Sequence, residues 1–375
     1  MRAQKQSAKA RRMGAIALTA AMACSMAFPQ FAFAVVKIDE TELVQGDNAI
    51  GEGTATLADS SLAMTGVTAN DLYTDEDLAV NFNGDNVIDQ VIVAGSANVS
   101  LDFAEENEVE DVIATENSNV SINANGHNEL EDVVAVNEAN VTVNVTGEND
   151  FESIFGTDTA NITVRGTTCQ MRDTINLGED ESASYLSTDR GKLVIDHVTV
   201  NLKSETAFVD SLRGDVVIDT SKIASDDDNK HATIEAGGKL NIRESVIDIT
   251  GLVHSESQMT IEHSDVKVKA PSEKYDDKNP YRVWSETGIT LIGEKNGEVK
   301  EGEVSGHKAF YLDTDNNKGT EVDLKADGTP AYYRCPSVKA LPQTGDAGMM
   351  AMPLAAGFVS ASAAAFAARR RRNRK

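Results

Sequence analysis

The stretch that decides the fold reads Asp77-Leu78-Ala79-Val80-Asn81, and its pattern returns four more times at a constant interval of 21 residues. The later copies are Asn98-Val99-Ser100-Leu101-Asp102, Asn119-Val120-Ser121-Ile122-Asn123, Asn140-Val141-Thr142-Val143-Asn144 and Asn161-Ile162-Thr163-Val164-Arg165. A fixed period of this length predicts a repeat architecture in which each unit stacks on its neighbours.

The chemistry of the motif predicts which repeat architecture forms. Apolar and small polar residues alternate in each copy, which is the period-two pattern of a strand with one buried face. No part of the repeat has the 3.6-residue periodicity of a helix. A repeat of 21 residues holds about three short strands and three turns, which is one coil of a parallel β-helix. The general preference for right-handed crossovers predicts a right-handed solenoid.

Asparagines also recur with this step. One set consists of Asn86, Asn107, Asn128 and Asn149. Neighbouring coils of a β-helix lie ~4.8 Å apart, so amides at one coil position are able to bond each other along the stack. We therefore interpret the repeated asparagines as structural ladders rather than as ligand-binding residues.

The coil pattern continues after Arg165 without the strict period. Pairs of apolar residues mark the strands, and successive pairs are 23, 24 and 19 residues apart. A serine follows three of the four pairs. The pairs are Leu193 and Ile195, Val216 and Ile218, Leu240 and Ile242, and Met259 and Ile261, and the serines are Ser221, Ser245 and Ser264. A constant motif with variable steps predicts turns of different length around one core.

The formal net charge of the chain is −26. Residues 35–344 hold 23 basic and 59 acidic residues, so this part alone carries −36. Such a surface excludes nucleic-acid binding, because phosphate contacts need a basic face, and it disfavours an anionic bilayer. It is typical of a highly soluble exterior protein, and it suits calcium.

The first residues have the pattern of a secretory signal peptide. Basic residues precede an apolar run from Met13 to Phe28, and Ala32-Phe33-Ala34 fits the small-x-small cleavage rule. We expect the mature chain to start near Val35.

The last residues combine three signals in order. The first is the pentapeptide Leu341-Pro342-Gln343-Thr344-Gly345. An apolar run at 349–368, long enough to span a bilayer, and a basic tail at 369–375 follow it. This region resembles the sorting signal of Gram-positive surface proteins, the LPxTG family. The resemblance implies that a sortase cleaves after Thr344 and joins it covalently to peptidoglycan. The protein is then secreted and wall-anchored, and only its precursor spans the membrane.

The middle of the chain, about 77–312, resembles bacterial surface proteins with right-handed parallel β-helix repeats, including carbohydrate-binding and adhesin-like ones. The resemblance rests on segments typical of β-helix coils, such as Gly191-Lys192-Leu193-Val194-Ile195 and Gly237-Gly238-Lys239-Leu240-Asn241-Ile242-Arg243. It implies the fold more strongly than the function.

These signals predict an all-β chain with about 21 residues per coil in its N-terminal half and less regular coils after it. The expected segments are a signal peptide at 1–34, an N-terminal cap with one irregular coil at 35–76, the parallel β-helix at 77–270, irregular C-terminal coils with a cap at 271–336, and a short linker with the sorting signal at 337–375.

Two groups of residues are candidates for ligand binding. Aromatic side chains, which offer flat faces to sugar rings, are paired as Tyr281 with Trp284 and as Tyr332 with Tyr333. The alternative is that they close the C-terminal end of the core. Asp313, Asp315 and Asn317 begin a pattern similar to a calcium loop, although its glycine comes one place late and its terminal glutamate is missing. The alternative here is a plain polar turn.

Charged residues also follow the strands of successive later coils. They are Asp196, His197, Asp219, Arg243, Glu244, Glu262 and His263. Together they suit a row of general acids and bases for polysaccharide cleavage, or simply an outward solubilising row. We favour the second interpretation and assign no catalytic residue. Cys169 and Cys335 lie about eight coils apart, or ~38 Å, so we expect no disulfide between them.

The sequence thus predicts a wall-anchored adhesin or glycan-binding display scaffold that is not an enzyme. Its expected partners are sortase, peptidoglycan and a glycan or host surface ligand, and its only candidate cofactor is calcium. A polysaccharide lyase or hydrolase is the first alternative, and a structural wall or fimbrial subunit is the second.

Overall fold

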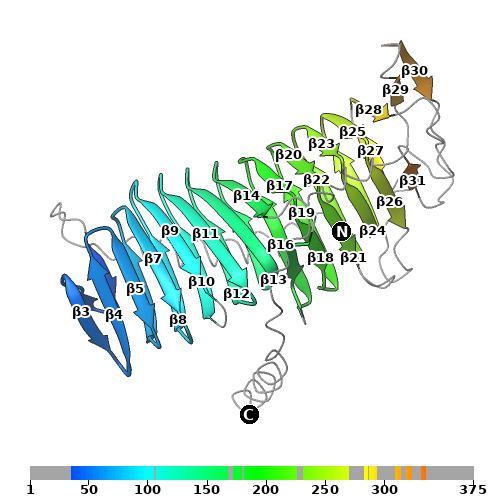
Figure 1. Ribbon diagram of the computed structural model, residues 1–375. Helices are drawn as coiled ribbons and strands as arrows, with labels where there is room; N and C mark the ends of the chain where they lie inside the picture. The colour runs from blue at the N-terminus through cyan, green and yellow to red at the C-terminus, as the bar shows by residue number, and fades with distance from the viewer. Residues whose placement is uncertain are drawn as a thin grey trace, which may run out of the picture. The chain divides into compact units, whose positions relative to one another are not determined.

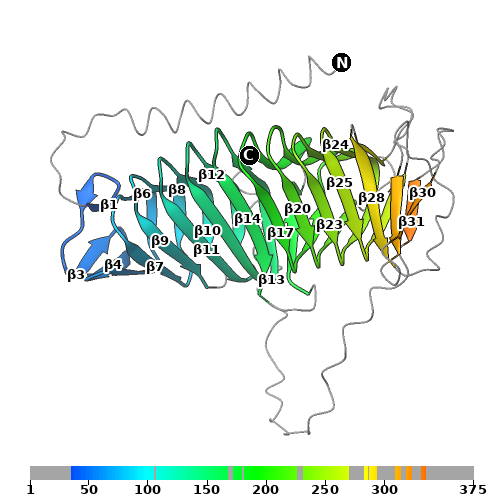
Figure 2. The same ribbon diagram turned by 90° about the horizontal axis from the view of Figure 1, so that it is seen from above.

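The computed structural model describes residues 35–104, 107–167, 172–179, 181–225, 231–269, 283–285, 287–293, 309–313, 318–322 and 331–334. Within these ranges the chain has no helix and winds into a β-solenoid of about nine turns with a spacing of about 21 residues. The prediction of an all-β parallel solenoid is therefore confirmed. Figures 1 and 2 show the strands stacked one behind the other, in two layers, from the blue N-terminal end to the yellow end.

One layer is sheet B, in which the strands of successive coils pair in parallel. Its strands are β5 (Ser61–Thr65), β7 (Leu78–Asn83), β9 (Asn98–Phe103), β11 (Asn119–Gly126), the first part of β13 (Asn140–Gly156), β14 (Asn161–Gly166), β17 (Leu193–Asp196), β20 (Val216–Asp219), β23 (Leu240–Arg243), β25 (Gln258–Glu262), β28 (Gly288–Gly293) and β29 (Ala309–Asp313).

The other layer is sheet A, which is also parallel from coil to coil. Its strands are β6 (Thr68–Thr74), β8 (Val87–Val93), β10 (Glu108–Ala114), β12 (Glu129–Ala135), the second part of β13, β15 (Thr174–Leu177), β16 (Ala183–Thr188), β18 (Thr199–Leu202), β19 (Thr206–Ser211), β21 (Lys222–Ser225), β22 (His231–Ala236), β24 (Val246–Ser255), β26 (Asp265–Lys269) and β27 (Val283–Ser285).

Pairing follows the sequence period without a shift. Asn119 lies opposite Asn98 on one side and Asn140 on the other. Val120 and Ile122, on either side of Ser121, are buried in one continuous core cluster. Because a shift of one residue would turn this apolar set outward, the repeated alternation holds the coils in register.

The expectation of three short strands per coil is wrong for the 21-residue coils. In β10 a single strand replaces two of them, and its pairing with β8 skips one residue between Val109 and Asp111. Val109 and Val112 are nevertheless both buried. The strand therefore bends at Glu110, and one bent strand covers two sides of the core without a turn.

Later coils replace this bend with a turn. The residues that continue β13 are divided between β15 and β16, and the next coils have β18 with β19 and β21 with β22 in the same places. This division gives three strands per coil and accounts for the steps of 23 and 24 residues, whereas β24 is again a single strand that pairs with both β21 and β22 in the coil whose step is 19 residues.

The three recurring serines stabilise one corner of these coils. The backbone N–H of Ser245 donates to the hydroxyl of Ser264 at 3.0 Å, and that of Ser221 donates to Ser245 at 3.1 Å. All three serines are fully buried. Each follows a residue with positive φ, so the hydroxyls bond backbone groups that the sharp corner would otherwise leave without partners.

Antiparallel strands lie at both ends of the described stack. At the N-terminal end β1 (Val36–Ile38) pairs with β2 (Thr41–Glu42) and β6, and β3 (Gly46–Ile50) pairs with β4 (Gly53–Ala58), which pairs with β5. At the other end β30 (Lys318–Val322) pairs with β29, and β31 (Ala331–Arg334) with β26. Antiparallel end strands cover the open edges of a solenoid, which would otherwise offer unpaired backbone.

Candidate functional site

Three rows of polar side chains run along the outer face of sheet B, where β9, β11, β13 and β14 stack in register. The amide row is Asn98, Asn119, Asn140 and Asn161. The hydroxyl row is Ser100, Ser121, Thr142 and Thr163. The mixed row is Asp102, Asn123, Asn144 and Arg165. They point outward because the residues between them point into the core.

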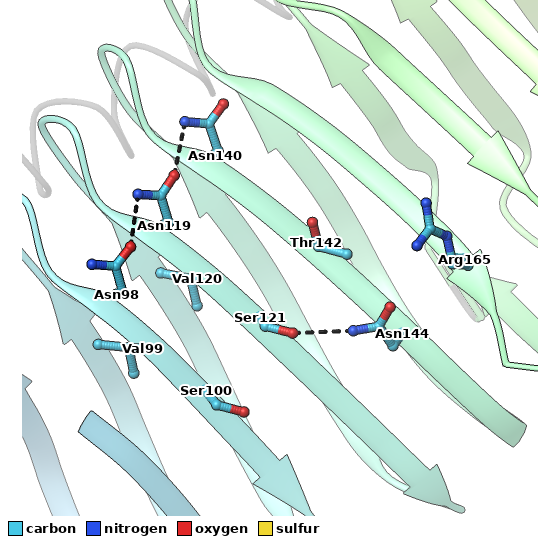
Figure 3. A pocket seen from close by; sticks show the side chains of 10 residues that line it. All are labelled: Asn98, Val99, Ser100, Asn119, Val120, Ser121, Asn140, Thr142, Asn144 and Arg165. Carbon is cyan, nitrogen blue, oxygen red and sulfur yellow. Dashed lines mark hydrogen bonds between the residues drawn. The ribbon is translucent and has the colours of Figure 1, made fainter. Parts of the chain in front are cut away.

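A trough of about 520 Å³ lies on these rows (Figure 3). Its lining includes Ser100, Ser121 and Thr142 between the longer amide row and the Asn144 and Arg165 side chains. The short side chains thus form a floor between two higher walls. None of the described residues that line the trough is aromatic.

Hydrogen bonds fix the amide row along its whole length. Asn119 donates to Asn98 at 3.1 Å, Asn140 to Asn119 at 3.1 Å, and Asn161 to Asn140 at 2.9 Å. Asp77 begins the row by accepting two bonds from Asn98, first from its backbone and then from its side chain, and these bonds lower the pKa of Asp77. Each central amide uses one N–H and one oxygen lone pair in the ladder, and Asn140 also donates to the backbone carbonyl of Glu138 at 3.3 Å. The second N–H of Asn119 and the remaining oxygen lone pairs of both amides are left for a ligand.

The mixed row is bonded to the floor of the trough. Asn144 donates to the carbonyl oxygen of Asn123 at 2.8 Å and to the hydroxyl of Ser121 at 3.1 Å. Asn123 bonds Asp102 and Ser100 in the same way. No described group bonds the hydroxyl of Thr142. The walls and the Ser100 and Ser121 hydroxyls of the floor are therefore held in place before any ligand arrives.

The character of this face changes at the end of the trough. In the mixed-row position Arg165 is followed by Asp196, Asp219, Arg243 and Glu262. Arg165 bonds Asp196 at 3.1 Å, and Arg243 bonds Asp219. Burial opposes ionisation of Asp219, but hydrogen bonds from Arg243 and Thr220 outweigh it and lower the pKa of Asp219.

The charged residues considered for catalysis therefore do lie side by side, but mostly as ion pairs of opposite sign. His197, Glu244 and His263 occupy the neighbouring corner with φ of 55°, 47° and 44°. His197 Nδ1 lies 2.5 Å from Asp196 Oδ1. This pairing favours the structural interpretation of the row, although it does not test activity.

The buried Asn ladder at Asn86 is only partly continuous. Asn86 donates to Asn107 at 2.9 Å, and Asn128 donates to Asn149 at 3.1 Å. Within the described residues no hydrogen bond joins Asn107 to Asn128, and the side-chain oxygen of Asn128 has no partner.

Only some of the predicted aromatic and calcium-binding residues lie within the described residues, so their ligand-binding role stays a prediction. Trp284 lies in β27 opposite His254, whereas Tyr332 and Tyr333 lie in β31 opposite β26. Asp313 ends β29. Tyr281, Asp315, Asn317, Cys169 and Cys335 lie outside the described residues. No described group of three or more His, Cys, Asp or Glu side chains is placed to hold a metal ion.

Sheet A carries an acidic row at its bend, made of Asp89, Glu110, Glu131 and Glu152. Burial, followed by repulsion from the Glu152 and Glu110 carboxylates in the neighbouring coils, raises the pKa of Glu131 to about 7. Like charges stacked at the strand spacing thus oppose each other's ionisation.

A second outward position of sheet A changes from apolar to polar along the stack. Ile113, Val134 and Phe155 form an apolar cluster that is separate from the main core, and Tyr185 stacks on Phe208 beside it with ring centroids 5.4 Å apart. The same position continues as Ser187, Asp210, Glu235 and His254. Ser187 bonds Asp210, and His254 Nδ1 lies 3.0 Å from Glu235 Oε1. Asp210 and His254 are at most 2% exposed.

Sequence reasoning missed the trough, because it assigned the repeated asparagines to structure and looked for aromatic residues as the sugar-binding signal. The usable signal is a small hydroxyl residue with an amide two places before and two places after it, repeated at a constant step. Such a surface is able to donate and accept hydrogen bonds at regular intervals.

Comparison with protein families matches residues 336–375 to the LPXTG cell wall anchor motif. No curated protein and no solved structure matches the chain. The motif shows a sortase-processed protein that is secreted and covalently linked to the Gram-positive cell wall, and the solenoid above shows that it carries β-helix repeats. Leu341–Gly345 lie outside the described residues, and no helix within the described ranges is long and apolar enough to cross a membrane.

Proposed function

We propose that this protein is a wall-anchored adhesin that binds glycans through the trough on sheet B. The single observation that carries the proposal is the set of exposed amides and hydroxyls of the three rows, which are fixed by hydrogen bonds to one another. Hydroxyl-rich ligands are recognised by donors and acceptors of this kind, and groups that are already held in place lose little entropy on binding.

The wall anchor supports this proposal, because it holds the solenoid outside the cell, where surface ligands are met. The net charge of −36 for residues 35–344 keeps the solenoid soluble there. An exposed binding face on a rigid, repetitive scaffold is also a common arrangement in solenoid proteins.

A second candidate function is cleavage of a polysaccharide, which the sheet A position of Asp210, Glu235 and His254 favours. Neighbouring carboxylates beside an imidazole are the groups that general acid–base chemistry uses. The burial of Asp210 and His254 weighs against this candidate, since a substrate has to reach both side chains. Release of new reducing ends by residues 35–344, lost in Asp210→Asn, would establish it over the binding function.

The adhesin proposal is tested on a glycan array with soluble residues 35–344. We expect binding to a narrow set of glycans, and loss of that binding in Ser121→Tyr, because the phenol ring fills the floor of the trough. Asn241→Tyr is the matched control, since Asn241 occupies the same outward position five coils further along, outside the trough. Binding that survives Ser121→Tyr but is lost in Asn241→Tyr would move the site to the charged coils. Absence of all binding would reject the proposal.

A further inference from the structure

We infer that the ligand of the trough is an uncharged, unbranched polysaccharide that lies along the solenoid axis, across four neighbouring coils. This inference rests on the proposed glycan-binding function and adds to it the direction, charge and length of the ligand. The observations that carry it are the direction in which the rows repeat, the place where their charge changes, and the bonding of their side chains.

The direction follows from the register of the strands. Along the axis a ligand meets an equivalent set of Asn, Ser or Thr, and Asn or Asp groups in β9, β11 and β13, at steps of ~4.8 Å. Across the axis the three rows occupy alternate residues of one strand, about 13 Å in all, and a ligand there meets a different kind of group at each step. A polymer that runs along one strand therefore meets each row once, whereas one that follows the axis meets an equivalent group in every coil of the trough.

The absence of charge on the ligand follows from the side chains of the three rows. Asp102 and Arg165 are the charged residues among them, and they stand at opposite ends. Asp102 accepts hydrogen bonds from Ser100 and Asn123, and Arg165 bonds Asp196. Each end charge thus already has a partner within the protein. An acidic polysaccharide would also be repelled by the charge of −36 on residues 35–344.

The length of the ligand follows from the weakness of each contact. The described lining of the trough has no aromatic ring on which a sugar could stack, so one sugar gains only a few neutral hydrogen bonds. The side-chain oxygens of Asn119 and Asn140 each accept one bond within the row and present their remaining lone pair at a fixed spacing. Useful affinity therefore requires the same weak contact to be repeated over several coils by one chain.

The experiment measures the affinity of residues 35–344 for linear neutral oligosaccharides, from disaccharide to octasaccharide, by titration calorimetry. The probes are β-1,4-glucans, β-1,4-mannans, β-1,3-glucans and α-1,4-glucans, with oligogalacturonates of matched length as the charged series. For at least one neutral series we expect affinity to rise with length. The affinity should reach a plateau once the chain spans the four coils, which is ~14 Å from the first coil to the last.

The variant Ser121→Tyr makes the test specific to axial binding. It blocks the second of the four coils, so a long oligosaccharide should lose about tenfold or more in affinity. A disaccharide can still use the floor at Thr142 with the Asn144 and Arg165 side chains, so its affinity should stay within about twofold. Asn241→Tyr should change neither.

The remaining outcomes overturn the inference in distinguishable ways. Affinity that does not depend on length, or an equal loss for short and long chains in Ser121→Tyr, would show a ligand that runs along one strand or ends in one coil. Tighter binding of oligogalacturonate would show a charged ligand. In both cases the adhesin proposal stands and this inference fails. No binding to any series overturns the inference, and if the glycan array is also negative, the proposed function fails as well.

Discussion

The side-chain amide of Asn119 donates a hydrogen bond to the side-chain carbonyl of Asn98, 3.1 Å away in the preceding coil and 21 residues earlier in the sequence. The same bond links Asn128 to Asn149 at 3.1 Å on the inside of the stack. One residue type at one sequence period therefore forms two ladders in different surroundings, one in water and one in the core.

The two ladders should differ strongly in their contribution to stability. In Asn149→Ala the backbone and side-chain N–H groups of Asn128 lose their acceptor in a site without water, and we expect a loss of about 2–4 kcal/mol in the free energy of unfolding. In Asn119→Ala water replaces the lost partners, so the loss should be about 0.5–1 kcal/mol. Urea unfolding of residues 35–344 measures both, and equal losses would show that the ladders do not differ in their access to water.

Acidification towards pH 5 should stabilise the solenoid through Glu131. Its pKa in the folded state is raised to about 7 by burial and by the Glu152 and Glu110 carboxylates, so the folded state binds a proton more tightly than the unfolded state does. The resulting gain in the free energy of unfolding is fully present below the ordinary carboxyl pKa, and it is lost as the pH rises through 7. With allowance for solvent screening, we expect the free energy of unfolding to be about 1–2 kcal/mol higher at pH 5 than at pH 8.

Glu131→Gln provides the check. It should stabilise the protein at pH 8 and flatten the pH dependence between pH 5 and pH 8, whereas Glu138→Gln, at an exposed turn, should leave the pH dependence as it is. An unchanged slope in Glu131→Gln would mean that other groups bind the proton.

The ion pair of Arg243 with Asp219 should contribute little to stability. The Arg243 side chain is 56% exposed, so water and salt screen the attraction. We expect Asp219→Asn to cost about 0.5–1 kcal/mol at low salt and less at 1 M salt. A double-mutant cycle with Arg243→Ala isolates the pair, and a coupling energy that does not fall with salt would contradict a solvent-screened contact.

Much of the fold was predictable because the period is carried by residues that touch one another. The pairing of Asn98, Asn119 and Asn140 is the sequence repeat itself, and the inward direction of Val120 and Ile122 follows from alternation. The bend at Glu110 was not predictable, since a turn of polar residues and a bent strand of polar residues have the same composition. The sequence therefore suggested three strands where the short coils have two.

The trough was harder to predict than the fold, because its shape depends on the relative lengths of neighbouring side chains rather than on one residue type. Ser121 and Thr142 are ordinary outward strand residues in sequence, and they form a floor only because longer side chains stand on both sides. Aromatic residues drew attention instead, as the pairs Tyr281 with Trp284 and Tyr332 with Tyr333, and their role stays a prediction. Conversely, the serines at 221, 245 and 264 were visible as a pattern, but their role became clear only from the bonds at the corner.

Successive coils lie so close together at Gly191 that a substitution there should be costly. A Cβ atom placed there would lie 1.7 Å from the carbonyl oxygen of Ala160 in the preceding coil, whose backbone cannot move without shifting its own strand. We expect Gly191→Ala to cost about 3 kcal/mol or more, since the added methyl group has to separate two hydrogen-bonded coils. Gly84→Ala is the control, because a Cβ there meets nothing within 4 Å and only the positive φ of 76° opposes it, at about 1–2 kcal/mol. Urea unfolding of the two variants compares the costs directly. A loss at Gly191 no larger than that at Gly84 would show that the coils yield to the methyl group and that the solenoid is less rigid than its regular pairing suggests.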